Sequence, residues 1–145
     1  VAWLALSVAF AIFFAGGGPN IVALIAVPQL LVVSLLTAGV AFLLHEVAHK
    51  VVAVHYGQLA EFRADYSMLF LAIMSALIGF IFAAPGAVHH RGYLNAEEHG
   101  HIAIAGPATN LLLAAAFLPI YAGGLTLGVE VLGTLGRFGI IINLF

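Results

Sequence analysis

Two histidines four residues apart enclose a glutamate in the stretch 45–50, which reads HEVAHK. On a helix, residues four apart differ by about 40° in direction and by one turn in height, so His45 and His49 can reach one metal ion. Glu46 lies about 100° further round, where it can contact a water molecule on that ion without being a ligand. Two histidines and one further ligand leave zinc a fourth position for water. The spacing therefore predicts a hydrolytic zinc site.

The alternative is that these three residues lie at a helix end among lipid headgroups, where water satisfies them. Burying Glu46 and two imidazoles in or beside a membrane helix costs several kcal/mol unless they are paired or bound to a metal. Ionisable groups inside a membrane segment are by default functional. The composition makes this environment relevant, because 64% of the 145 residues are hydrophobic and only 7% are charged. Such a chain belongs to the membrane class.

Charged residues fall in clusters between long apolar runs, which lie at 1–15, 21–44, 68–84 and 102–121. This pattern predicts an all-α polytopic membrane protein with about four to five membrane segments. The metal-site helix is expected to begin near Pro28 and to run to Tyr56, with Gly57 as its C-cap. The run 68–84 either crosses the membrane or enters and returns. The sequence GGGPN at 16–20 predicts a turn.

The segment after residue 84 predicts a small membrane-associated β-hairpin between the metal-site helix and the next core helix, with its turn signals at 91–98. Four histidines in this region are expected to be solvated loop residues, although they could bind a metal adventitiously or sense pH: His89, His90, His99 and His101. The glycine-rich stretch 123–139 predicts a connection or interfacial segment. Absence of cysteine excludes disulfides and thiolate metal sites.

A second motif, AGPATN, lies at 105–110. Pro107 suits the first turn of a helix. Gly106 and Asn110 would form a small face that allows close helix approach and one buried amide. Packing alone could explain this motif, whereas Asn110 in a metal cleft could hydrogen-bond a peptide backbone.

With HEVAHK, AGPATN and FAAPGAV (82–88) in this order, residues 38–117 resemble the site-two proteases, which are intramembrane zinc metalloproteases, and in particular their small prokaryotic members. The resemblance implies one membrane-embedded protease core over 1–145, in a multi-pass protein of a prokaryotic cell membrane. Its partners would be transmembrane protein substrates and the lipid bilayer, and no nucleic acid is expected. The implied residues are the ligands of one zinc ion, His45 and His49; the general base, Glu46; and the substrate-binding Gly106, Pro107 and Asn110.

The family takes its third zinc ligand from an aspartate in a later N-x-x-P…D-G motif, which this sequence does not contain. The run IIINLF resembles the start of that helix. We therefore expect the sequence to be truncated at both ends and the third ligand to lie beyond Phe145. The resemblance also implies that 82–90 is a strand edge that holds an unwound substrate. Two alternatives remain: a catalytically incomplete family member that acts as a membrane scaffold or subunit, and a metal carrier that uses the histidine pairs.

Overall fold

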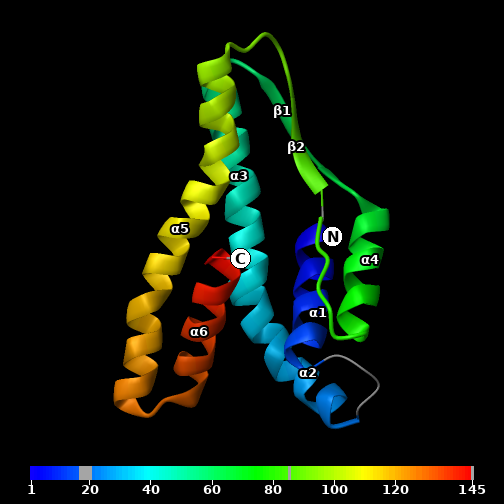
Figure 1. Ribbon diagram of the computed structural model, residues 1–145, viewed down its shortest axis with the longest axis vertical. Coiled ribbons are helices and arrows are strands. Elements are labelled where there is room, and N and C mark those ends of the chain that lie inside the picture. Colours follow the sequence, from blue (N-terminus) through cyan, green and yellow to red (C-terminus); the bar gives the residue numbers. More distant parts are fainter. Residues whose placement is uncertain (17–20, 85, 145) are drawn as a thin grey trace. The chain divides into compact units, whose positions relative to one another are not determined.

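The computed structural model describes residues 1–16, 21–84 and 86–144, and most of them are helical (Figure 1). The elements are α1 (Ala2–Phe14), α2 (Ile21–Ser34), the π-helical turn η1 (Leu35–Gly39), α3 (Val40–His55), β1 (Leu59–Ala64), α4 (Tyr66–Leu77), β2 (Gly86–Arg91), α5 (Ala96–Leu127) and α6 (Glu130–Leu144). They form two compact units, one of residues 1–40 and 64–86 and one of residues 41–63 and 87–145. The turn predicted at 16–20 falls largely on 17–20, outside the described residues.

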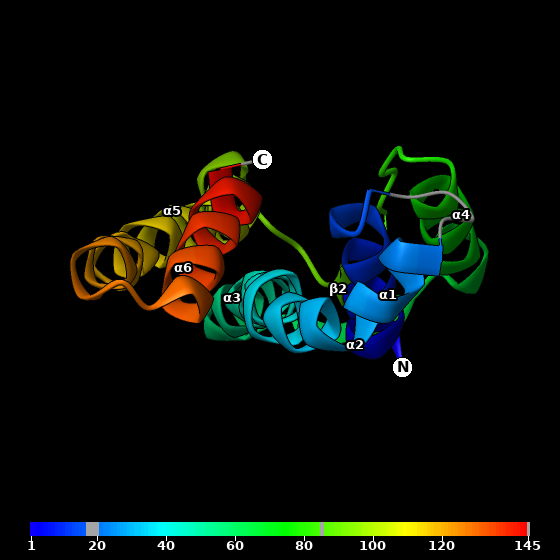
Figure 2. The ribbon, with the colours of Figure 1, turned by 90° about the horizontal axis from the view of Figure 1, so that it is seen from below.

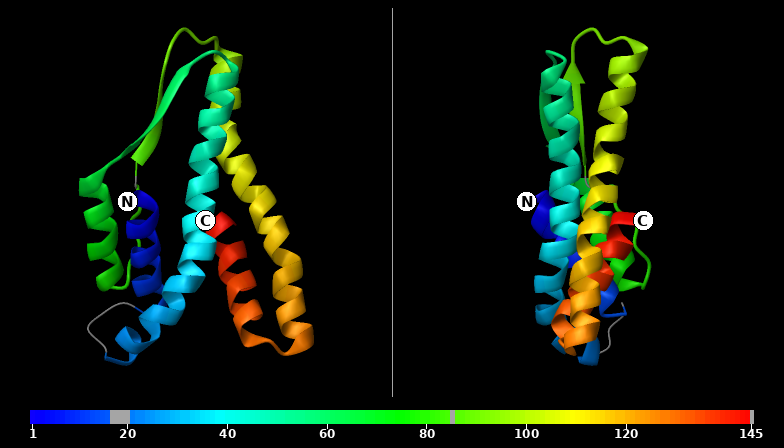
Figure 3. Two further views of the ribbon diagram at one scale, coloured as in Figure 1. Left: turned by 180° about the vertical axis from the view of Figure 1, so that it is seen from behind. Right: turned by 90° about the vertical axis from the view of Figure 1, so that its left-hand side faces the viewer.

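Small residues let the helices of the first unit approach closely. Ala9 of α1 meets Ala72 and Ala76 of α4 in a fully buried cluster, and partly buried apolar side chains surround it. Figures 1 and 3 show α1 and α4 side by side. At η1, Gly39 packs against Trp3 and Ser7 of α1 so tightly that a Cβ atom has no room. This unit therefore depends on side chains with little volume at its contacts.

Two helical stretches are long and apolar enough to cross a membrane, judged by length and composition: Pro28–His55 with 28 residues and Ala96–Leu127 with 32. The other two apolar helices, α1 and α4, have 13 and 12 residues. Twelve residues extend roughly 18 Å, less than the roughly 30 Å of a hydrocarbon core, so the length of α4 does not identify it as a crossing segment. The described residues thus support two of the predicted four to five segments.

The predicted end of the metal-site helix is confirmed. Gly57 follows α3 with a φ of +72°, the left-handed conformation that favours glycine. The N–H of Gln58 donates to the carbonyl of Ala53 at 3.0 Å, and that of Gly57 to the carbonyl of Val54 at 2.9 Å, which together form a Schellman motif. The predicted start near Pro28 is wrong, because the helix begins at Ile21 and continues past the proline. A proline removes one N–H donor, and a helix can continue beyond it.

The sheet is a pair of antiparallel strands, β1 and β2, which α4 separates in sequence. The predicted hairpin is therefore wrong: β2 pairs with the earlier strand 59–64. Its supposed turn signal begins α5 instead. The side chain of Asn95 accepts from the N–H of Glu98, and the Glu98 carboxylate accepts from the N–H of Asn95, both at 2.9 Å. This capping box satisfies helix N–H groups locally, which explains why a polar cluster resembling a turn opens a helix.

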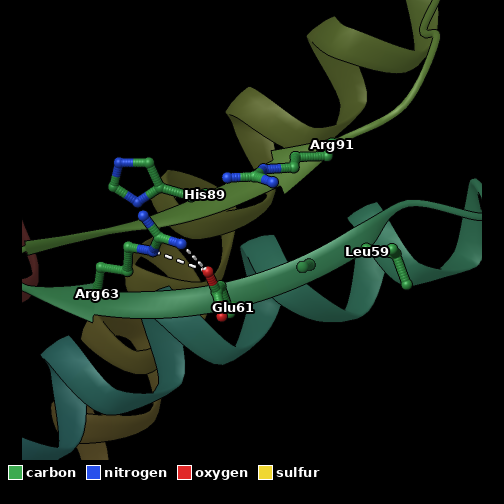
Figure 4. Close-up of a pocket in the computed structure, with 6 residues that line it drawn as sticks. Leu59, Glu61, Arg63, His89 and Arg91 are labelled. Carbon is green, nitrogen blue, oxygen red and sulfur yellow. Dashed lines mark hydrogen bonds and ion pairs between the residues drawn. The ribbon is translucent and has the colours of Figure 1, made fainter.

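One face of the sheet carries charged side chains, Glu61 and Arg63 from β1 and His89 and Arg91 from β2 (Figure 4). A cavity of about 330 Å³ lies on this face. Arg63 Nε donates to Glu61 Oε1 at 2.7 Å, and this hydrogen bond, helped by the guanidinium charge, lowers the pKa of the exposed Glu61 carboxyl. On the other face, Phe62 packs edge-on against Phe42 of α3 with ring centroids 5.6 Å apart. One face is therefore solvated, and the other contacts the metal-site helix.

Helices α5 and α6 lie side by side (Figures 1 and 2). The predicted connection at 123–139 is instead the end of α5, a short turn at Gly128 with a φ of +66°, and the start of α6. Glycines allow the close approach. A Cβ at Gly124 would meet the backbone of Gly133, and a Cβ at Gly136 would meet the backbone of Tyr121.

Replacing Gly136 with alanine is expected to lower the free energy of unfolding by about 1–3 kcal/mol, because the new methyl group meets backbone atoms that cannot rotate away. Gly133→Ala in the same helix is the matched control, since a Cβ there meets nothing within 4 Å. It should be neutral or stabilising by roughly 0.5–1 kcal/mol. Thermal unfolding followed by circular dichroism in detergent measures both. Equal midpoints for the two variants would contradict the close packing of α5 on α6.

Candidate metal centre

The two imidazoles of HEVAHK lie on one face of α3 and point toward each other. His45 Nε2 and His49 Nε2 are 3.0 Å apart, and the ring centroids are separated by 4.7 Å. Two nitrogen ligands on one tetrahedral zinc lie roughly 3.3 Å apart, given zinc–nitrogen bonds of about 2.0–2.1 Å. The pair therefore has the separation that a shared metal ion requires.

A backbone carbonyl of α5 orients one of these rings. His49 Nδ1 donates to the carbonyl oxygen of Ile102 at 2.7 Å. Because a carbonyl can only accept, Nδ1 carries the proton, and the lone pair of the neutral ring lies on Nε2, facing His45. Such an outer hydrogen bond is the usual support of a metal-binding histidine. Sequence reasoning missed Ile102, because a contact through a backbone carbonyl leaves no signal in the side-chain pattern.

Gly106 of α5 lies directly against both imidazoles (Figure 3 shows α3 beside α5). A Cβ at this position would meet Nε2 of His45 and Nε2 of His49. The sequence assigned Gly106 to substrate binding, and the structure places it where any side chain would occupy the space in front of the two nitrogens. Its lack of a side chain keeps that space open.

The other two residues of the second motif differ in their placement. Asn110 lies one turn beyond Gly106, with its side chain beside the imidazole of His45. Its Oδ1 is buried and accepts no hydrogen bond of normal geometry. Pro107 is exposed and lies inside α5, eleven residues after its first residue, Ala96, so its predicted place in the first helical turn is wrong. The capping box at 95–98 is the start signal of this helix.

Glu46 is half-buried, and its carboxylate accepts a hydrogen bond from the backbone of Val88 in β2. The second oxygen, Oε2, is buried without a partner. Glu46, His49 and Val88 line one cavity of about 200 Å³. A carboxylate that lines a cavity and is held by a backbone group is suited to accept a proton from a water molecule there. Val88 falls within the predicted edge segment 82–90.

The residues present at this site fit two of the ligands of a zinc ion, the imidazoles of His45 and His49. The two Nε2 atoms face each other, and Gly106, which has no side chain, lies directly against both of them. Among residues 1–16, 21–84 and 86–144, no group of three or more His, Cys, Asp or Glu could hold a metal together. Asp65, the only aspartate, caps α4 by accepting from the N–H of Met68 at 3.0 Å.

The four histidines between residues 89 and 101 are distributed over a strand and a helix, and His55 is the last residue of α3. His89 and His90 lie in β2, whereas His99 and His101 lie in the first two turns of α5, so the predicted loop placement is wrong. His101 Nδ1 and the hydroxyl of Tyr56 share a hydrogen bond of 2.7 Å. His90 and His99 face each other with ring centroids 5.9 Å apart.

One curated relative shares extended sequence similarity with this chain. A protein of Methanocaldococcus jannaschii named "Putative zinc metalloprotease MJ0611" is 43% identical over 119 residues, which cover 79% of this chain and 60% of the relative. The chain thus spans about three fifths of that relative's length. No protein-family model matches the chain. No solved structure matches it at a significant level.

Proposed function

We propose that this chain forms the metal-binding core of a zinc metalloprotease of the site-two type, which cleaves peptide bonds within transmembrane segments of other proteins. The observation that carries the proposal is the 3.0 Å approach of His45 Nε2 and His49 Nε2, together with a cavity that both His49 and Glu46 line. The similarity to a relative named as a zinc metalloprotease supports the same chemistry.

Each residue has a defined task in this proposal. A zinc ion held by His45 and His49 would supply Lewis acidity toward water and the scissile carbonyl. Glu46 accepts the proton of the attacking water at Oε2 and returns it to the leaving amine. The backbone N–H of Val88 contacts the Glu46 carboxylate and so helps to orient the base. Asn110 places a buried amide oxygen beside the imidazole of His45, and an amide oxygen has a second lone pair that suits an N–H group of the substrate backbone.

The sheet suggests how a substrate is presented. The backbone of Val88 faces Glu46, so one edge of β2 lies next to the proposed base. Among the described residues the sheet has only two strands, and an extended peptide can add to the edge that β1 leaves unpaired. A helical substrate must unwind before its carbonyls become accessible, and strand addition replaces the hydrogen bonds lost in unwinding. The apolar stretch Pro28–His55, which carries the histidine pair, supports a site at membrane depth.

The test is zinc-dependent cleavage by the full natural protein that contains this chain. Purified in detergent, it should cut a labelled single-span model substrate inside the apolar segment, as located by mass spectrometry. Removing zinc with 1,10-phenanthroline should abolish the cut, and one equivalent of zinc should restore it. If the protein cuts only a soluble unfolded control protein, the assignment as a metalloprotease stands, but cleavage within the membrane is refuted. If the protein binds no zinc and has no activity, the alternative of a catalytically incomplete membrane scaffold is favoured.

A further inference from the structure

His90 and His99 come together at the same cavity that Glu46 lines. His90 lies on β2 and is half-buried, and His99 lies in the first turn of α5. Their ring centroids are 5.9 Å apart, with the planes at 73°. The fold thus brings two imidazoles from different elements to one wall of a space of about 200 Å³.

This separation suits two ligands of one metal ion. With metal–nitrogen bonds of about 2.0–2.1 Å, the centroids of two imidazoles on one tetrahedral ion lie roughly 5.2 Å apart. The observed 5.9 Å is slightly longer, so binding one ion requires the two rings to move a little closer together. Among the residues that the structure describes, neither ring has a hydrogen-bond partner that would hold its nitrogens. Imidazole pairs favour zinc, nickel and copper over magnesium or calcium.

The other histidines on these elements are engaged or directed elsewhere. His101 shares a hydrogen bond with the hydroxyl of Tyr56 and stacks on its ring. His89 lies on the opposite, charged face of β2, because neighbouring residues of a strand point to opposite sides (Figure 4). The pairing of His90 with His99 therefore follows from the fold and not from a general abundance of histidine.

We propose that His90 and His99 bind a second divalent ion of the zinc class, with water as its remaining ligands, and that this ion inhibits the protease. No group of three or more His, Cys, Asp or Glu among the described residues could hold one metal, so we assign this ion to the pair His90–His99 alone, although His49 lines the same cavity. A cation in the cavity that Glu46 lines attracts its carboxylate and fills space that water and substrate need. Binding of the ion by His90 and His99 does not depend on the proposed function, whereas its inhibitory effect does.

The binding experiment uses the full protein in which His45→Ala and His49→Ala have removed the first pair. After chelator treatment it is titrated with Zn²⁺ in equilibrium dialysis, and with Cu²⁺ under electron paramagnetic resonance to detect nitrogen ligands. We expect one ion, and a loss of affinity of at least about tenfold on adding His90→Ala or His99→Ala. His89→Ala, on the other face of the same strand, is the matched control and should bind as its parent does. Equal affinity in all three variants would overturn the proposal.

The inhibition experiment uses the protein with its first pair intact and one equivalent of zinc. Further Zn²⁺ should reduce cleavage by wild type and by His89→Ala over the concentration range in which the second ion binds. His99→Ala, normalised to its own activity, should need at least about tenfold more zinc for the same loss. Identical inhibition of all three refutes the inhibitory role. If the protein cleaves nothing, the proposed function is refuted. The second metal site still stands in that case if His90→Ala loses the second ion.

Discussion

Replacing Glu46 with glutamine is expected to abolish peptide-bond cleavage while zinc remains bound. Glutamine keeps the shape of the side chain, and its amide oxygen can still accept from the backbone of Val88. It cannot accept a proton from water, and loss of a general base lowers a rate by about 10²–10⁴. The zinc content should be unchanged because Glu46 is not assigned as a ligand. Cleavage rates and metal content are measured on the same preparation.

Glu61→Gln is the matched control for this change. Glu61 is exposed on the charged face of the sheet and pairs with Arg63, away from the cavity that Glu46 lines. The same loss of one carboxylate should leave cleavage close to the wild-type rate. Full activity in Glu46→Gln would refute its assignment as the base. If Glu46→Gln loses both zinc and activity, Glu46 is instead a zinc ligand or a residue that holds the ligands in place.

Gly106→Ala is expected to remove zinc binding and, with it, activity. The added methyl group would meet Nε2 of both His45 and His49, the atoms assigned to the metal. Relief requires α5 to move away from α3, which also disturbs the hydrogen bond from His49 to the carbonyl of Ile102. Disturbing such an outer partner alone costs about 10–100-fold in metal affinity, and direct obstruction should cost more. Equilibrium dialysis with Zn²⁺ measures the change.

The control for this variant is Gly100→Ala, six residues earlier in α5, where a Cβ meets nothing within 4 Å. It should bind zinc as wild type does. Because a ligand stabilises the folded state to which it binds, added zinc should raise the unfolding temperature of wild type and Gly100→Ala but not that of Gly106→Ala. A normal zinc-induced rise in Gly106→Ala would show that the two histidines hold the ion away from α5.

The sequence predicts the contact within one pair of histidines but not the contact within the other. His45 and His49 are four residues apart on one helix, so helix geometry alone predicts that their rings meet. His90 and His99 are close in sequence but lie on a strand and a helix, and the sequence predicted both as solvated loop residues. Only the placement of β2 against α5 brings them together.

The sequence by itself determined the features that depend on neighbouring residues. It predicted the helix that carries HEVAHK, its end before Gly57 and the largely helical architecture, because these follow from apolar composition and from backbone preferences within a few residues. The capping box at 95–98 was also a local signal, but a polar cluster with asparagine is typical of turns as well as helix starts. The tertiary context decided between them.

Only the tertiary structure decided which distant groups surround the candidate site. The pairing of β1 with β2 across α4, the carbonyl of Ile102 on a ring 53 residues earlier, and the closeness of Gly106 to both imidazoles all depend on packing between elements. Backbone carbonyls and absent side chains carry no chemical signature in a sequence. Their role arises when a second helix is placed against the first, and the physical reason is that a metal site is completed by whatever surface packs over it.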